Sequence, residues 1–142
     1  MVVDMNTLYT ATAVATGDGR NGHVQTFDGT IDAAVRTPKE LGGEGGATNP
    51  EQLFAAGYAA CFHSAIKVVA GRDKLDVTGT EVSASVSIGA DDSGGFGLAV
   101  ELDVHAPALD QETAERIVAA AHEVCPYSNA TRGNVEVTLE VA

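Results

Sequence analysis

The sequence predicts an α+β fold with largely antiparallel sheet, on three observations. Segments with alternating apolar and polar residues gather at residues 8–36 and 77–107. Two helical segments divide these groups from each other and from a final strand, which gives the order βββ-α-ββ-α-β. Strands grouped with strands in this way are typical of α+β proteins. The 142 residues fit one domain, residues 1–142, long enough to bury its own core.

The N-terminal segments predict three short strands. Residues 8–16, LYTATAVAT, are rich in Thr, Val and Tyr and lead into the turn GDGRNG. Residues 23–36 contain two more β-like runs, broken at Asp28-Gly29, a pair favoured in tight turns. We therefore expect a hairpin followed by a third strand.

A loop and a helix follow. Residues 37–50, TPKELGGEGGATNP, have the composition of a loop. Asn49 is placed as an N-cap, Pro50 as the first helical residue and Glu51 as a favourable charge in the first turn. The helix is expected to run to residue 69 or 70 and to stop at Gly71.

The second half repeats the pattern. Residues 77–90 and 96–107 alternate around the turn DDSGG and predict a strand pair. Residues 109–125 predict a second helix with Asp110 as its N-cap. Apolar residues within it recur at helical spacing: Ile117, Val118, Ala121 and Val124. The final strand is placed in residues 134–142, NVEVTLEVA.

The first helix lacks a polar face. From residue 53 to residue 62 every side chain is apolar or small, so we expect this helix to be buried on all sides. One domain of this size can hardly surround it, and its Ala and Gly positions allow another backbone to approach closely. A second copy of the chain would supply the cover, which predicts a homodimer.

Composition and charge exclude several classes of function. The net charge is −12, from 20 acidic and 8 basic residues, which argues against nucleic acid and anionic membranes as partners. The longest apolar run, residues 53–62, is far shorter than the roughly 20 residues of a membrane span. The first ten residues lack the features of a secretory signal, so a cytoplasmic location is expected.

The two cysteines, Cys61 and Cys125, are the main candidates for chemistry. Cys61 lies about three turns into the apolar helix, where a free cysteine commonly fills space as a small hydrophobe. Cys125 ends the second helix directly before Pro126, where the helix must stop. In a reducing compartment two such thiols are inert, metal-binding or catalytic, and a reversible disulfide between them is one of the open readings.

A reactive thiol needs a neighbour that stabilises the thiolate. Arg20 is the cation presented on the glycine-rich turn, either as a solvated turn residue or as a functional group. Glu51 is either a charge at the helix start or the anchor that holds the Arg20 guanidinium by a bidentate pair.

Other chemistry has weaker support. His63 lies about 200° around the helix from Cys61, so it points away from that thiol. His122 shares a helix face with Cys125, but adjacency alone does not make an oriented Cys–His pair. Paired ligands typical of a metal site are missing, so we expect no metal. GGEGG lacks the Gly-Lys-Ser/Thr of a phosphate loop, so nucleotide binding is rejected.

Three segments, TNPEQLFAAGYAACFHSA, CPYSNATRGNVEV and DGRNGHV, resemble the organic hydroperoxide resistance (Ohr) family, within the superfamily shared with osmotically inducible protein C (OsmC). The similarity covers essentially the whole chain. It implies an OsmC/Ohr-like fold with sheets wrapped around central helices in an intertwined homodimer. It also implies a thiol peroxidase that reduces organic hydroperoxides to alcohols, with an external dithiol, dihydrolipoamide or a lipoylated protein, as reductant and no bound cofactor.

The resemblance also assigns roles. Cys61 matches the peroxidatic cysteine, Cys125 the resolving cysteine, and Arg20 and Glu51 the pair that activates the thiol. Apolar side chains near Cys61 are expected to bind an alkyl or lipid hydroperoxide: Leu53, Phe54, Tyr58 and Phe62. The alternatives are an OsmC-type peroxidase and a non-enzymatic redox sensor or carrier of hydrophobic ligands. Steady turnover of an organic hydroperoxide separates a catalyst from a sensor.

Overall fold

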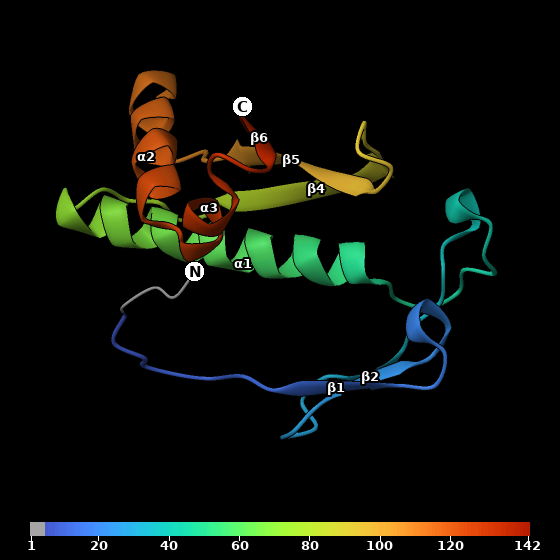
Figure 1. The fold of residues 1–142 in the computed structure, drawn as a ribbon. Coiled ribbons are helices and arrows are strands. Elements are labelled where there is room, and N and C mark those ends of the chain that lie inside the picture. Colours follow the sequence, from blue (N-terminus) through green and yellow to red (C-terminus); the bar gives the residue numbers. More distant parts are fainter. Residues whose placement is uncertain (1–4) are drawn as a thin grey trace. The chain divides into compact units, whose positions relative to one another are not determined.

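The computed structural model describes residues 5–142, which divide after residue 50 into two compact units. Each unit is described by itself (Figure 1). The single domain predicted for residues 1–142 stays a prediction. The predicted absence of a secretory signal rests partly on residues 1–4, which lie outside the described residues.

The first unit contains a three-stranded antiparallel sheet in the order β1-β2-β3. Its elements in chain order are β1 (Ala13–Thr16), the 3-10 turn η1 (Gly19–Asn21), β2 (His23–Thr26), β3 (Asp32–Ala34) and the 3-10 turn η2 (Lys39–Leu41). The predicted hairpin and third strand are confirmed. β1 is shorter than the predicted 8–16, because residues 8–12 pair with no strand of this sheet.

The second unit combines three helices with a second sheet. Its elements are α1 (Pro50–Arg72), β4 (Glu81–Ala90), β5 (Phe96–His105), α2 (Gln111–Val124), α3 (Pro126–Thr131) and β6 (Glu136–Val141). β4 pairs antiparallel with β5, and β6 joins β5 in parallel. Figure 1 shows α1 running along one face of this sheet. The α+β class with mainly antiparallel pairing is confirmed.

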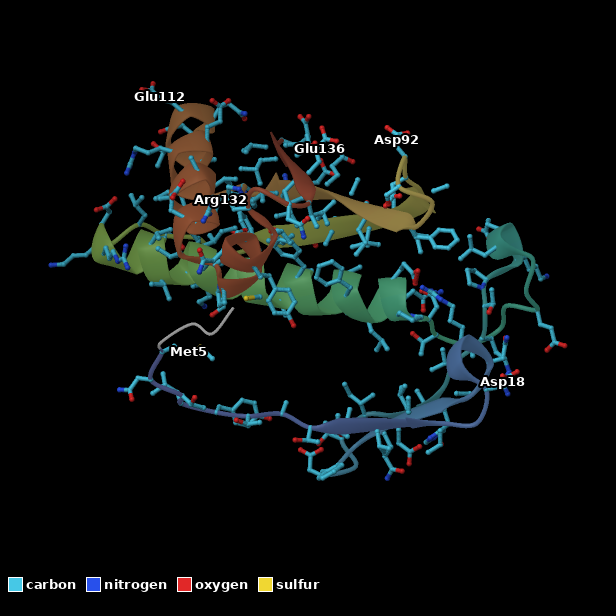
Figure 2. The ribbon with its side chains drawn as sticks, viewed as in Figure 1. Met5, Asp18, Asp92, Glu112, Arg132 and Glu136 are labelled. Carbon is cyan, nitrogen blue, oxygen red and sulfur yellow. The ribbon has the colours of Figure 1, made fainter. Side chains whose placement is uncertain are left out.

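The core of the second unit lies between α1, the sheet and α2. Alternation in β5 turns one set of side chains inward, and the helices contribute residues three and four positions apart. The buried set includes Tyr58, Phe62, Ala65, Ile66, Val69 and Ala70 of α1, Val100, Leu102 and Val104 of β5, and Ala114, Ile117, Val118 and Ala121 of α2. Polar residues of the sheet face outward, and Figure 2 shows Asp92, Glu112 and Glu136 on the side of the unit away from α1.

Both long helices have defined ends. The carboxylate of Asp110 accepts a hydrogen bond from the Thr113 N–H at 2.8 Å, which confirms Asp110 as the N-cap of α2. α1 continues past Gly71, where it was expected to stop. Lys74 takes the left-handed conformation, with φ of 54°, and the Leu75 N–H bonds the Ala70 carbonyl, as in a Schellman motif.

One face of α1 is buried within the single chain and another is exposed. The exposed positions recur at helical spacing and are mostly small or apolar: Ala56, Ala60, Ser64, Lys67 and Val68. In the single chain only one face of α1 is buried, so the predicted burial on all sides is not seen there. The homodimer stays a prediction.

By length and composition α1 is able to cross a membrane. A core helix of a soluble protein passes the same test. α1 supplies six buried residues to the core of the second unit, so we describe it as a core helix.

Candidate active site

Two thiols from distant parts of the sequence meet in the second unit. Cys61 lies in the middle of α1, and Cys125 lies between α2 and α3. Both are free thiols, and the Cys125 Sγ donates a hydrogen bond to the Cys61 Sγ at 3.5 Å across 64 positions of sequence. Formation of an S–S bond requires the sulfurs to close to about 2.0 Å. The pair is therefore one short movement from a disulfide.

Cys125 is held by the backbone on both sides. Cys125 is the C-cap of α2, where its N–H donates to the Ala121 carbonyl at 2.9 Å. It is also the N-cap of α3, where its carbonyl accepts a hydrogen bond from the Asn129 N–H at 2.9 Å. Pro126 ends α2, as predicted, and also begins α3, which the sequence analysis missed. The signal for α3 was present, because proline favours the first position of a helix.

The two thiols differ in exposure. Cys125 is fully buried, whereas Cys61 is partly exposed and so is the thiol that a substrate can reach. Partial burial raises the pKa of the Cys61 thiol, and the nearby Cys125 thiol raises it further. A hydrogen bond from the Tyr127 backbone N–H to Cys61 acts in the opposite direction and favours the thiolate. A cation near Cys61 would lower the pKa further.

Three aromatic rings pack together next to the thiols. The ring centroids of Phe54, Tyr58 and Tyr127 lie 5.7 to 6.0 Å from one another. Gly57 lets the Tyr127 ring approach α1, because a Cβ at residue 57 would lie 3.2 Å from the ring and from its hydroxyl. This aromatic cluster, which we define as Phe54, Tyr58 and Tyr127, joins α1 to α3 beside Cys61.

The predicted substrate-binding residues divide into two groups. Leu53 and Phe54 are partly exposed. Tyr58 and Phe62 have no exposed surface and belong to the core. Their contact with substrate stays a prediction. Tyr127 was not singled out from the sequence, yet it is 39% exposed, and its backbone N–H bonds Cys61.

A network of buried hydroxyl groups links the three helices that carry or flank the thiols. The Ser128 Oγ lies 2.8 Å from the Tyr58 hydroxyl and 2.8 Å from the Nδ1 of His122. The Thr131 Oγ1 lies 3.3 Å from the Tyr58 hydroxyl. Ser128 has no exposed surface. His122 therefore bonds Ser128, and sequence reasoning had weighed it only as a partner of Cys125.

The surroundings of His122 favour its neutral form. Partial burial and the Arg132 guanidinium lower its pKa, while Glu123 raises it. Arg132 donates a hydrogen bond to the His122 carbonyl at 2.6 Å, which satisfies an otherwise open carbonyl in the last turn of α2. Figure 2 shows Arg132 beside the junction of α2 and α3.

Arg20 lies in the first unit, on a braced turn. It is the middle residue of η1, between strands β1 and β2. A Cβ at Gly22 would lie only 2.1 Å from the Thr16 carbonyl oxygen, so the turn requires glycine there. The Asn21 side chain accepts the Thr37 N–H at 3.2 Å and ties the turn to the following segment. The scaffold presents Arg20 on an ordered loop, as a functional cation requires.

Glu51 lies in the first turn of α1 and is partly buried. Ten residues separate it from Cys61, which corresponds to about 15 Å along one helix. Its predicted pairing with Arg20, and that of Arg20 with Cys61, stay predictions. Among residues 5–142, no group of three or more His, Cys, Asp or Glu is placed to hold a metal ion.

Comparison with known proteins adds the family. Residues 43–140 match the model of the OsmC-like protein family. An organic hydroperoxide resistance protein of Xanthomonas axonopodis pv. citri is 56% identical over 137 residues, with 95% of each chain covered. OhrB of Bacillus subtilis, also named an organic hydroperoxide resistance protein, is 49% identical and covers 94% of this chain and 98% of its own.

Solved structures agree with this result. The crystal structure of an organic hydroperoxide resistance protein from Legionella pneumophila has a TM-score of 0.92 and 56% identity, covering 96% of this chain and 99% of that one. The structure of Bacillus subtilis OhrB has a TM-score of 0.88 and 47% identity, covering 96% and 100%. With these matches over nearly the full length, the chain belongs to the OsmC-like family and, within it, to the organic hydroperoxide resistance proteins.

Proposed function

We propose that this protein is a cysteine-based peroxidase that reduces organic hydroperoxides to alcohols. The observation that carries the proposal is the pair of free thiols 3.5 Å apart, one partly exposed and one buried. The names of its relatives concern resistance to organic hydroperoxides, which supports the same substrate class.

In the first step the Cys61 thiolate attacks the distal oxygen of the hydroperoxide. The O–O bond breaks, the alkoxide takes a proton to leave as the alcohol, and Cys61 becomes a sulfenic acid. Cys61 has this role because Cys125 has no exposed surface to offer a substrate. The Tyr127 N–H favours the thiolate form of Cys61.

In the second step Cys125 attacks the sulfur of the sulfenic acid. The S–O bond breaks, hydroxide leaves and is protonated to water, and the Cys61–Cys125 disulfide forms. The short distance between the sulfurs favours this reaction over further oxidation of Cys61 by a second hydroperoxide. An external dithiol such as dihydrolipoamide, free or protein-bound, then opens the disulfide by exchange and returns both thiols.

Arg20 and Glu51 complete the proposed site. The Arg20 guanidinium stabilises the Cys61 thiolate and the alkoxide that forms when the O–O bond breaks. The Glu51 carboxylate orients that guanidinium by a bidentate pair. The ordered turn that carries Arg20 supports its role, because an ordered loop loses less entropy when it delivers the cation.

The proposed assembly is a homodimer. The exposed face of α1, formed by Ala56, Ala60, Ser64, Lys67 and Val68, is apolar enough to need cover and small enough for close approach of another chain. Two free cysteines at contact distance fit a reducing compartment, and we place the protein in the cytoplasm.

An organic rather than inorganic peroxide is the proposed substrate. Phe54 and Tyr127 offer apolar surface next to Cys61, and an alkyl chain gains free energy from such surface whereas hydrogen peroxide does not. Comparison of cumene hydroperoxide with hydrogen peroxide at equal concentration measures this preference.

Steady-state turnover tests the function. Reduced protein with excess cumene hydroperoxide and dihydrolipoamide is expected to consume many equivalents of peroxide, and Cys61→Ser to consume none above the uncatalysed rate. Consumption of a single equivalent by the wild type, followed by arrest despite dithiol, would identify a redox sensor. Substantial activity in Cys61→Ser would remove that residue from the mechanism.

A further inference from the structure

Ser128 occupies a special position in the second unit. Its hydroxyl is fully buried and lies within 2.8 Å of two polar groups that belong to different helices, Tyr58 of α1 and His122 of α2. Ser128 itself belongs to α3. One hydroxyl therefore links all three helices of the unit that carries the thiols.

We propose that Ser128 is a positioning residue for disulfide formation: its hydroxyl fixes α3 and the end of α2 against α1 and so holds the Cys125 sulfur beside the Cys61 sulfur. This inference rests on the proposed function, because it concerns the second step of that cycle. The Ser128 hydroxyl bonds Tyr58 and His122 and neither sulfur, so its effect on the thiols passes through the backbone.

The spacing of the linked residues gives the network its effect. Tyr58 lies three positions before Cys61, and His122 lies three positions before Cys125, so each is one helical turn from a thiol. Ser128 lies three positions after Cys125. Since backbone geometry within one turn of a helix is nearly rigid, fixing these three side chains to one another also fixes the two sulfurs.

The hydrogen-bond inventory is consistent with this role. A neutral histidine accepts a hydrogen bond at Nδ1 when the other ring nitrogen carries the hydrogen. The Ser128 hydroxyl then donates to His122, and the Tyr58 hydroxyl donates to Ser128. The lowered pKa of His122 supports the neutral ring. Thr131 continues the network, with its hydroxyl bonded to the Tyr127 carbonyl at 3.0 Å.

Removing the Ser128 hydroxyl leaves two polar groups in the interior without that partner. The loss of these hydrogen bonds costs free energy, which the unit can recover by admitting water or by shifting α3. Either change moves Cys125, which is the N-cap of α3. Cys61 lies in the middle of α1, outside α3, and remains partly exposed and open to peroxide. The inference therefore predicts that the two chemical steps separate: the reaction with peroxide persists, and disulfide formation slows.

Single-turnover kinetics test this separation. Reduced protein is mixed with one equivalent of cumene hydroperoxide, and samples are quenched with dimedone, which traps sulfenic acid, and with an alkylating reagent, which marks free thiols. Intact mass then resolves sulfenic acid from disulfide at each time. In Ser128→Ala, peroxide consumption should stay within about twofold of wild type, while disulfide formation slows about tenfold, the effect of one buried hydrogen bond lost.

Four further variants make the result specific. Ser128→Thr keeps the hydroxyl and should restore disulfide formation to within about threefold of wild type. Tyr58→Phe removes the other end of the bond and should slow the same step. The variant that combines Ser128→Ala with Tyr58→Phe should be slower than Ser128→Ala by less than the two single effects combined, because the Tyr58–Ser128 bond is already lost in Ser128→Ala. Ser85→Ala, the same chemical change on the exposed side of β4, should alter neither step.

Two outcomes would overturn the positioning role of Ser128. Disulfide formation at the wild-type rate in Ser128→Ala overturns the proposal, and so does equal slowing of both steps, which would mean a general loss of structure. If Ser128→Ala does not fold, Tyr58→Phe carries the same test.

A second oxidant keeps this test separate from that of the proposed function. Diamide oxidises a thiol pair to the disulfide without any peroxide: Cys61 adds to it, and Cys125 then displaces the reduced reagent. The same slowing in Ser128→Ala is expected with diamide. If the wild type does not turn over hydroperoxide, yet diamide oxidises Ser128→Ala more slowly than the wild type, the proposed function fails and the positioning role stands. A wild-type diamide rate in the variant overturns the positioning role alone.

Discussion

The Sγ of Cys125 lies 3.5 Å from the Sγ of Cys61 and donates a hydrogen bond to it. The contact joins the cap between α2 and α3 to the middle of α1 and leaves both thiols reduced. In the proposed cycle, a sulfenic acid formed on Cys61 therefore has a second thiol within reach before a second hydroperoxide arrives.

Replacing Cys125 by serine is expected to change the product and leave the first step intact. Without a resolving thiol, Cys61 stops at sulfenic acid and then proceeds to sulfinic acid with excess peroxide. Intact mass after one equivalent of peroxide should show loss of two hydrogens in the wild type and gain of one oxygen in Cys125→Ser. Identical mass changes in both proteins would remove Cys125 from the mechanism.

The same substitution is expected to shift the pH dependence of Cys61 alkylation. Burial raises the pKa of Cys61, and negative charge on the neighbouring Cys125 sulfur raises it further, so removal of that sulfur lowers the pKa and the thiolate forms at lower pH. The iodoacetamide rate at Cys61, followed by peptide mass, should reach half its maximum at lower pH in Cys125→Ser. Cys125→Ala is the matched control for the serine hydroxyl and should shift in the same direction. A shift to higher pH in both variants would contradict the prediction.

Gly57→Ala is expected to reduce turnover several-fold through Tyr127. The added Cβ would lie 3.2 Å from the Tyr127 ring, tighter than an ordinary contact, so the ring must move and its backbone N–H with it. That N–H favours the Cys61 thiolate.

The matched control for Gly57→Ala is Gly71→Ala, also in α1, where an added Cβ meets nothing within 4 Å. It should retain activity and gain up to about 1 kcal/mol in stability. In a Tyr127→Ala background Gly57→Ala should have no further effect on turnover. An additive loss there would show that the glycine acts by another route.

Glu51 is expected to act in the partner subunit's site. Residue 51 lies about 15 Å along α1 from Cys61, too far for both side chains to contact one guanidinium of their own chain. Inactive Cys61→Ser is refolded together with impaired Glu51→Ala. Heterodimers then contain one site in which both residues are intact, so activity should exceed the sum of the parents. Activity equal to that sum, with heterodimers confirmed by native mass, would mean that Glu51 acts within its own chain.

The sheets and long helices could be predicted because local pattern determines them. Strict alternation in β4 and β5 leaves one register that buries an apolar face, and Asp110 marks the start of α2. α1 ends two or three residues later than predicted, because Gly71, which is typical of a helix end, lies within the helix. Lys74 accepts the left-handed conformation instead, since Leu75 can then close the turn onto the core.

The candidate site was only partly predictable for a different reason. The resemblance to a known family assigned the roles of Cys61 and Cys125, whereas spacing of 64 residues gives no reason for contact. The roles of Ser128 and Tyr127 depend on which side chains from α1, α2 and α3 face one another, and no local pattern carries that information. α3 itself was missed because Pro126 was read as an end and not also as a beginning.

The long separation of the two thiols in the chain also affects unfolding. An oxidised Cys61–Cys125 pair closes a loop of 64 residues that contains the C-terminal half of α1, the β4–β5 hairpin and all of α2. Such a closure removes conformations from the unfolded chain and, in the chain-entropy model, favours the folded state by about 4 kcal/mol. The oxidised protein should thus melt at a higher temperature than the reduced one, so each catalytic cycle passes through a more stable and a less stable form of the same fold.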